Sequence, residues 1–159
     1  MKTASVAELK KKLSDMSPKV LKELCLRLVK YKKENKELLT YLLFSADDEE
    51  GYIQEIKEEM DEAFEEINSA NLYWAKKSIR KILRLATKYI KYSGNKQTEV
   101  VVLLYFCRKM LDSGIKFKSS TTLLNLYERQ IIKISKALAT LHEDLQYDYA
   151  DELQAVSLN

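Results

Sequence analysis

Glycine and proline are so scarce in this chain that long helices are the structure it most readily forms. Among 159 residues there are three glycines and a single proline, the two residues that most often interrupt a helix. Hydrophobic residues make up 46% of the chain, which disfavours disorder and supplies one core. We therefore predict a single all-α domain over residues 1–159 and exclude an all-β fold.

The first 45 residues are predicted to form short helices. Ser5 opens an S-x-x-E capping box, in which hydroxyl and carboxylate bind the free amides of the first helical turn. Ser17 and Pro18 have the residue types of an N-cap and a first helical position, so a second helix should follow directly. Asn35 is expected to cap the short apolar segment that comes next.

Longer antiparallel helices are predicted over residues 48–156, where apolar residues recur every three or four positions. Gly94 should end one of them in the left-handed conformation, and Thr98 should begin the next, which we expect to be largely buried. With short turns between them, about eight helices would pack as an antiparallel bundle or as a short α-solenoid with HEAT-like stacking of hairpins. The predicted long helices cover residues 48–67, 70–92, 98–114, 121–141 and 142–156.

Charge is distributed in blocks along the chain. Residues 47–66 hold eleven acids against one lysine, whereas residues 76–91 hold seven lysines or arginines and no acid. At about 100° per residue, five of these cations lie within about 60° of a sixth, Lys77, and the apolar residues lie on the other side of the helix. We call this set the basic stripe: Lys77, Arg80, Lys81, Arg84, Lys88 and Lys91.

Three interpretations of the basic stripe are open. In the first interpretation it is an ordinary solvated helix face, whose positive charge is partly compensated by the acidic helix before it. Alternatively it binds an acidic protein partner, since complementary charge steers encounter. It could also bind nucleic acid or another phosphate ligand, for which Tyr73 and Tyr92 are the obvious stacking rings beside it. Of the two binding interpretations we favour the acidic partner and keep nucleic acid as the alternative, and the solvated face stays open beside them.

No residue pattern indicates catalysis, a cofactor or a metal. His142 is the only histidine, and a capping or exposed role suits it better than metal binding. The acids Glu58, Glu62 and Glu66 have the spacing found in carboxylate-bridged metal bundles, but the E-x-x-H motif of those bundles is missing. The three glycines rule out glycine-rich phosphate loops. We expect no enzyme, no catalytic residue, no cofactor and no metal.

The remaining features concern the cysteines, location and self-association. Cys25 and Cys107 lack disulfide or zinc spacing and are predicted to be buried thiols. No signal-like or membrane-spanning apolar run occurs, so a cytoplasmic location is expected, and a membrane is not expected as a partner. Near the C-terminus, Tyr149 should pack in the core and Tyr147 should be more exposed. The acidic stretch around them could dock on the basic stripe of the same chain or of a second copy.

Three segments, in this order, carry a resemblance to a known family: "LSDMSPKVLKELCLRLVKYKKENKELLTYLL", "YWAKKSIRKILRL" and "VVVLLYFCRKMLDSG". Over roughly residues 8–155 the chain resembles a family of small all-helical bacterial proteins of unknown function. That resemblance implies a helical fold and carries over no activity or site residue. Together with the residues, it leads us to expect a non-enzymatic interaction module.

Overall fold

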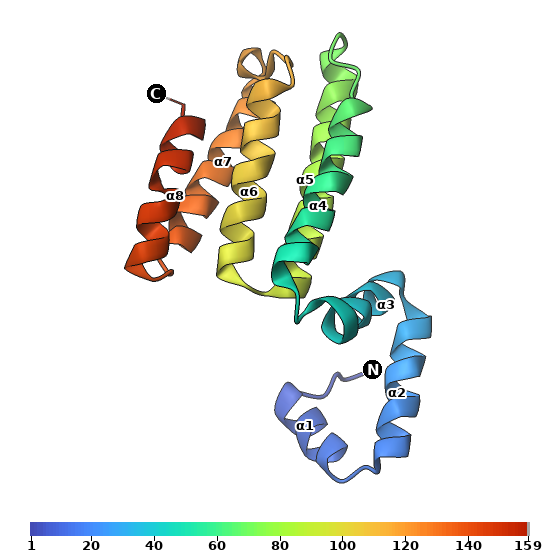
Figure 1. The fold of residues 1–159 in the computed structure, drawn as a ribbon. Helices are drawn as coiled ribbons and strands as arrows, with labels where there is room; N and C mark the ends of the chain where they lie inside the picture. Colours follow the sequence, from blue (N-terminus) through green and yellow to red (C-terminus); the bar gives the residue numbers. More distant parts are fainter. Residues whose placement is uncertain (159) are drawn as a thin grey trace. The chain divides into compact units, whose positions relative to one another are not determined.

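The computed structural model describes residues 1–158 (Figure 1). Throughout this range the secondary structure is helical, without any strand, which confirms the predicted all-α class. The chain divides into two compact units, an N-terminal unit of Met1–Phe44 and a C-terminal unit from Ser45 onward. Within the described residues, no helix is both long enough and apolar enough to cross a bilayer.

The N-terminal unit consists of three short helices. Glu8 donates its amide to the Ser5 hydroxyl at 3.3 Å and accepts the Ser5 amide at 2.8 Å, so the predicted capping box is confirmed. Of the helices in this unit, the second packs against the third, and none of the three contains a buried residue. The helices are α1 (Val6–Ser14), α2 (Pro18–Tyr31) and α3 (Lys33–Thr40), followed by a π-helical turn at Tyr41–Ser45.

Two predictions for the N-terminal unit are wrong. The third helix begins at Lys33, with Lys32 as its N-cap, and Asn35 is already inside it. The Asn35 side chain instead donates a hydrogen bond to the carbonyl of Leu28 at 2.8 Å and so ties α3 to the end of α2. Cys25 is exposed, because the face of α2 that carries it is not covered.

The C-terminal unit is an antiparallel bundle of five longer helices. In Figure 1, α4 and α5 form one pair, and α6 lies between this pair and the pair of α7 and α8. Helix α6 therefore contacts all four of the others. The helices are α4 (Glu49–Glu65), α5 (Leu72–Ser93), α6 (Lys96–Asp112), α7 (Thr121–Leu138) and α8 (Glu143–Val156), with a 3-10 turn at Phe117–Ser119.

The central position of α6 explains why its residues are apolar on nearly every side. The prediction that this helix is largely buried is confirmed, and Cys107 is buried with it, as predicted. The surrounding helices turn one apolar face toward it, including the fully buried Met60 of α4, Ile79 of α5 and Leu123 of α7. Eight residues of α6 are buried: Thr98, Val100, Val102, Leu103, Leu104, Phe106, Cys107 and Met110.

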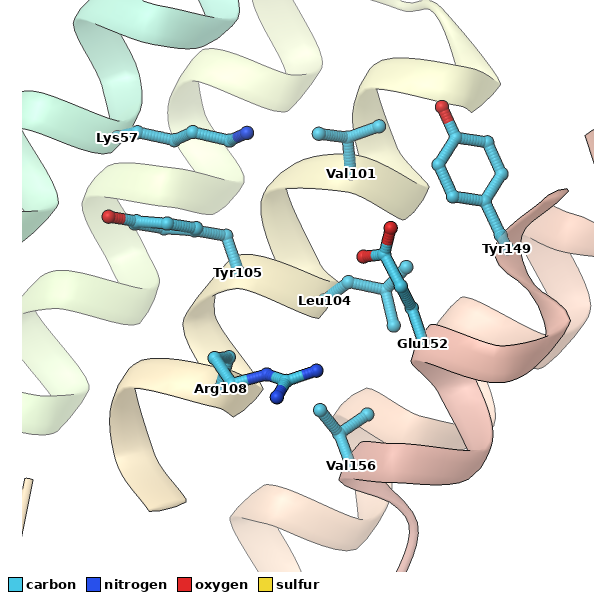
Figure 2. A pocket seen from close by; sticks show the side chains of 8 residues that line it. All are labelled: Lys57, Val101, Leu104, Tyr105, Arg108, Tyr149, Glu152 and Val156. Carbon is cyan, nitrogen blue, oxygen red and sulfur yellow. The ribbon is translucent and has the colours of Figure 1, made fainter. Parts of the chain in front are cut away.

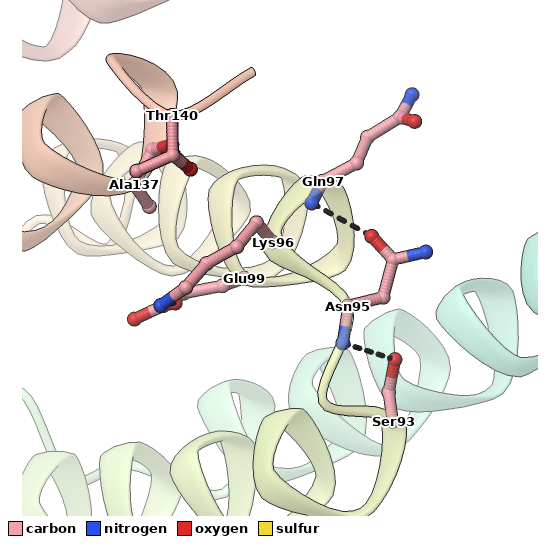
Figure 3. A network of polar contacts seen from close by, with 7 residues as sticks. All are labelled: Ser93, Asn95, Lys96, Gln97, Glu99, Ala137 and Thr140. Carbon is pink, nitrogen blue, oxygen red and sulfur yellow. Dashed lines mark hydrogen bonds and ion pairs between the residues drawn. The ribbon is translucent and has the colours of Figure 1, made fainter.

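At the turn between α5 and α6, the first helix ends where predicted, but the second helix begins earlier than predicted. Gly94 has the left-handed φ of 65°, which confirms it as the end of α5. Figure 3 shows the start of α6, where the Gln97 amide donates to the Asn95 side chain at 2.8 Å. Because Asn95 provides the cap, Thr98 lies within α6, where it is buried and donates its hydroxyl to Glu49.

Candidate interaction surface on helix α5

Helix α5 presents one apolar side to the core and one cationic side to solvent. Its start is fixed by Asn71, whose side chain accepts the amides of Tyr73 at 3.0 Å and Trp74 at 3.3 Å. Because the opposite side is anchored in the core, the orientation of the basic stripe is set by packing. The buried residues of α5 are Ala75, Ile79, Ile82, Ala86 and Ile90.

Five of the six residues of the basic stripe are exposed, as their helical spacing predicts. None of these five forms an ion pair within 4.0 Å inside the described part of the chain. Their charge is therefore available to a partner. The five are Lys77, Arg80, Lys81, Arg84 and Lys91.

Lys88 differs from the other residues of the stripe. It is half-buried, and its ammonium lies 4.8 Å from the centroid of the Tyr89 ring. A cation held over an aromatic face is attracted by the ring quadrupole. Because its side chain is half-buried, we treat Lys88 as part of the local packing and the other five, exposed cations as the candidate binding residues.

Two exposed aromatic rings extend the basic stripe at the N-terminal end of α5. Tyr73 is 60% exposed and Trp74 is 53% exposed, and their ring centroids lie 5.4 Å apart. The ammonium of Lys77 lies 4.7 Å from each centroid. The sequence prediction named Tyr73 and omitted Trp74, although Trp74 precedes Lys77 by three residues and so shares its face. Tyr92, the other predicted stacking ring, is half-buried beside Tyr89.

The acidic face of α4 borders the basic stripe along one edge. A shallow cavity of about 190 Å³ between α4 and α5 is lined by Glu59 and Glu66 on one side and Lys81 on the other. These groups form no ion pair within 4.0 Å in the described structure, so they face each other across solvent. Lys81 is the residue of the basic stripe that lines this cavity. The exposed acids of α4 and its C-cap are Glu50, Glu55, Glu58, Glu59, Glu62, Glu65 and Glu66.

The acidic C-terminal helix does not cover the basic stripe of its own chain. Helix α8 packs against α6 and α7, and in Figure 1 α6 separates it from α5. Tyr149 is half-buried and accepts a hydrogen bond from Gln97 at 3.0 Å, whereas Tyr147 is 84% exposed. Tyr147 is exposed as predicted, whereas Tyr149, expected in the core, is only half-buried because it lies at the edge of the cavity between α6 and α8. The basic stripe is thus open on the side away from the core.

No family model, curated protein or solved structure matches this chain.

The resemblance to a helical bacterial family therefore stays a prediction, and the functional argument depends on the surface itself. His142 acts as the N-cap of α8, accepting the Asp144 amide at 3.2 Å on Nδ1. Among the described residues, no three His, Cys, Asp or Glu side chains are grouped so that they could hold a metal ion.

A second charged region lies where α4, α6 and α8 meet, and Figure 2 shows the side chains that surround it. The cavity has a volume of about 300 Å³ and an apolar floor that includes Val101 and Leu104. Arg108 and Glu152 lie at its rim. The side chains that line it include no cysteine, serine or histidine.

The polar groups beside this cavity bind one another. Asp61 accepts hydrogen bonds from the Tyr105 hydroxyl at 2.6 Å and from the Lys109 ammonium at 2.8 Å. Burial opposes ionisation of Asp61, but these donors hold the pKa of its carboxyl below the ordinary value. Burial and the neighbouring carboxylate raise the pKa of Tyr105 to about 12. The cluster is best explained as a link between α4 and α6.

Proposed function

We propose that this protein is a non-enzymatic interaction module that binds an acidic segment of a protein partner through the basic stripe of α5. The observation that supports the proposal is the set of five exposed cations on one helix face, without an acid on that helix or an ion pair within the described chain. Because the opposite face of α5 is buried, these cations are held in a fixed row.

The length of the basic stripe limits the size of the partner segment. Lys77 and Lys91 are separated by a rise of about 21 Å along the helix axis. An acidic helix of about 14 residues, or a shorter extended segment, would span that distance. Exposed ion pairs contribute at most about 1 kcal/mol each, so charge alone gives weak, salt-sensitive binding. Tyr73 and Trp74 would add the contact area that aromatic residues typically provide at interfaces.

The acidic face of α4 favours a narrow partner over duplex nucleic acid. Charges within a Debye length, about 10 Å at 0.1 M salt, still repel a polyanion. Glu59 and Glu66 lie across a shallow cavity from Lys81, so a wide polyanion over the stripe would also approach these carboxylates. An acidic protein segment confined to the Arg80 and Arg84 side avoids them.

Single-stranded nucleic acid is the second candidate, and the exposed rings of Tyr73 and Trp74 are the observation that favours it. Base stacking on such rings is worth about 1–3 kcal/mol per base and tolerates any sequence. A strand that stacked on these rings could direct its phosphates along the basic stripe.

Binding of two labelled probes, measured by fluorescence anisotropy, would test the proposal. One probe is a 14-residue peptide with glutamates along one helical face, and the other is a 15-nucleotide oligothymidylate. The Arg80→Glu/Arg84→Glu variant reverses two exposed charges, and Lys133→Glu/Lys136→Glu makes the same net change on exposed residues of α7. We expect the peptide to bind at 50 mM salt, to weaken more than tenfold at 300 mM, and to be lost only in the α5 variant.

Two results would contradict the proposal. Equal loss in both variants would show that the peptide responds to net charge, and no peptide binding at 50 mM salt would remove the stripe as an acidic-partner site. Tighter binding of the oligonucleotide, with a loss of about tenfold in Trp74→Ala, would favour the nucleic-acid candidate instead.

A further inference from the structure

The N-terminal unit exposes apolar faces that would normally be covered. On α1, Val6, Leu9 and Leu13 follow one another at spacings of three and four, so they lie on one face, and they are 83%, 50% and 42% exposed. Isolated helices shorter than about 12–15 residues are marginal in water. A unit built from such helices, with no buried residue in any of them, gains stability when another surface covers its apolar faces.

Helix α2 repeats the same pattern with a wider apolar face. Val20, Leu28 and Tyr31 lie within about 80° of one another on the helix, and all three are exposed. Three of its four basic residues, Lys19, Lys22 and Lys30, lie on the opposite side within a similar arc, whereas Arg27 lies at the edge of the apolar face beside Val20. Both helices are thus amphipathic, with lysine as the main polar residue.

The charge of this unit is complementary to an anionic surface. Residues 1–44 contain eleven lysines or arginines and five acids. On α1, Lys10 and Lys12 lie on either side of the apolar face, each within about 100° of its centre. Lysines in these positions can extend their ammonium groups to a charged layer while the leucines between them enter an apolar one.

We propose that the N-terminal unit binds the surface of an anionic lipid bilayer, with α1 and α2 lying in the plane of the headgroups. A bilayer supplies an apolar layer directly beneath negative headgroups, and amphipathic helices with lysine-rich polar faces bind there. The helices contain 9 and 14 residues, which gives lengths of about 13 and 21 Å. Both are shorter than the roughly 30 Å hydrocarbon core, so they would lie on the membrane and not cross it.

A second copy of the chain fits this surface less well. Its N-terminal unit carries the same positive surplus and would repel the first. Its acidic helix α4 turns its carboxylates outward and keeps Ile56, Met60 and Phe64 buried, so it has charge but no apolar face to offer. The expectation that a membrane is not a partner came from the lack of a spanning segment, which does not bear on surface binding.

The test is co-sedimentation of the full-length protein with vesicles. We expect the partition coefficient to be at least about tenfold higher with 30% phosphatidylglycerol in phosphatidylcholine than with phosphatidylcholine alone. In the Leu9→Gln/Leu13→Gln variant it should fall about tenfold or more. The Ile132→Gln variant is the matched control, because Ile132 is 54% exposed on α7 of the C-terminal unit, and it should bind as the parent protein does.

Further measurements distinguish membrane binding by α1 and α2 from binding through the basic stripe and from dimerisation. The Arg80→Gln/Arg84→Gln variant should bind vesicles normally, and loss of binding there would assign the effect to the basic stripe and overturn the proposal. Absence of binding to anionic vesicles at 100 mM salt would also overturn it. Sedimentation velocity without lipid should show a monomer; a dimer that Leu9→Gln/Leu13→Gln dissociates would assign the apolar faces to a second copy instead.

Discussion

The hydroxyl of Tyr127 is predicted to hold the C-terminal end of α8 against α7. Tyr127 is fully buried on α7, and its hydroxyl donates a hydrogen bond to the carbonyl of Val156, the last residue of α8. The last carbonyls of a helix have no partner within the helix. Val156 is itself 1% exposed, so water cannot readily replace the tyrosine.

The substitution Tyr127→Phe isolates this hydrogen bond. The ring stays in place, including its stacking on Phe117 at a centroid distance of 5.0 Å. A typical hydrogen bond contributes about 0.5–1.5 kcal/mol, and leaving a buried carbonyl without a donor costs about 1–3 kcal/mol. We therefore expect the free energy of unfolding to fall by about 1–3 kcal/mol.

Urea denaturation followed by Trp74 fluorescence and by circular dichroism would measure this change. The midpoint should fall by roughly 0.5–1.5 M if the slope is about 2 kcal/mol/M and is unchanged by the substitution. Tyr147→Phe is the control, since Tyr147 is 84% exposed and should change stability by less than about 0.5 kcal/mol. If both variants unfold at the midpoint of the parent protein, the proposed anchoring of α8 is refuted.

Two further predictions concern titration and thiol access. The pKa of the Asp61 carboxyl is lowered in the folded state. Its contribution to stability is therefore fully present at pH values above the pKa of the unfolded state, about 3.9, and is lost as the pH falls through the lower pKa of the folded state. Urea midpoints of the parent and of Asp61→Asn should therefore differ at pH 7 and converge below about pH 4; a constant difference would contradict the assignment. Cys25 is exposed, whereas Cys107 is buried and its pKa is raised to about 12 by burial. A disulfide reagent should therefore label one thiol per native chain and two thiols per unfolded chain. Labelling of both thiols in the native protein would contradict the burial of Cys107.

The helical class and the order of the helices could be predicted because they follow from local patterns. Serine and proline at the first turns, glycine at the end of α5 and apolar spacing of three and four each act within a few residues. A helix start was less predictable where two nearby residues could each act as its N-cap. Asn95 and Thr98 are both good N-caps, and the structure uses Asn95 because Thr98 is needed in the core, where it meets Glu49.

The direction of the basic stripe could be predicted because a helix with one buried face fixes the angle of every other residue. Five of the six cations are exposed, as that angle requires. The helical angle does not predict how far each side chain is buried. Lys88 lies within the predicted arc, yet it is half-buried and its ammonium lies over the Tyr89 ring, which helical geometry alone does not reveal.

The N-terminal unit shows the complementary limit of sequence patterns. The spacing of Val6, Leu9 and Leu13 places them on one face of α1, and such a face is ordinarily assigned to the core. Here the face is exposed. The amphipathic pattern thus predicts that this surface contacts something, but it does not predict which molecule the contact is with. The charge around the face carries that information, since lysines beside exposed leucines match a surface that is both anionic and apolar. The same reasoning separates the two units. Helix α5 exposes a row of cations and carries exposed rings only at its N-terminal end, at Tyr73 and Trp74, which suits an acidic protein segment. Helices α1 and α2 expose aliphatic residues and lysines along their length, which suits a membrane surface.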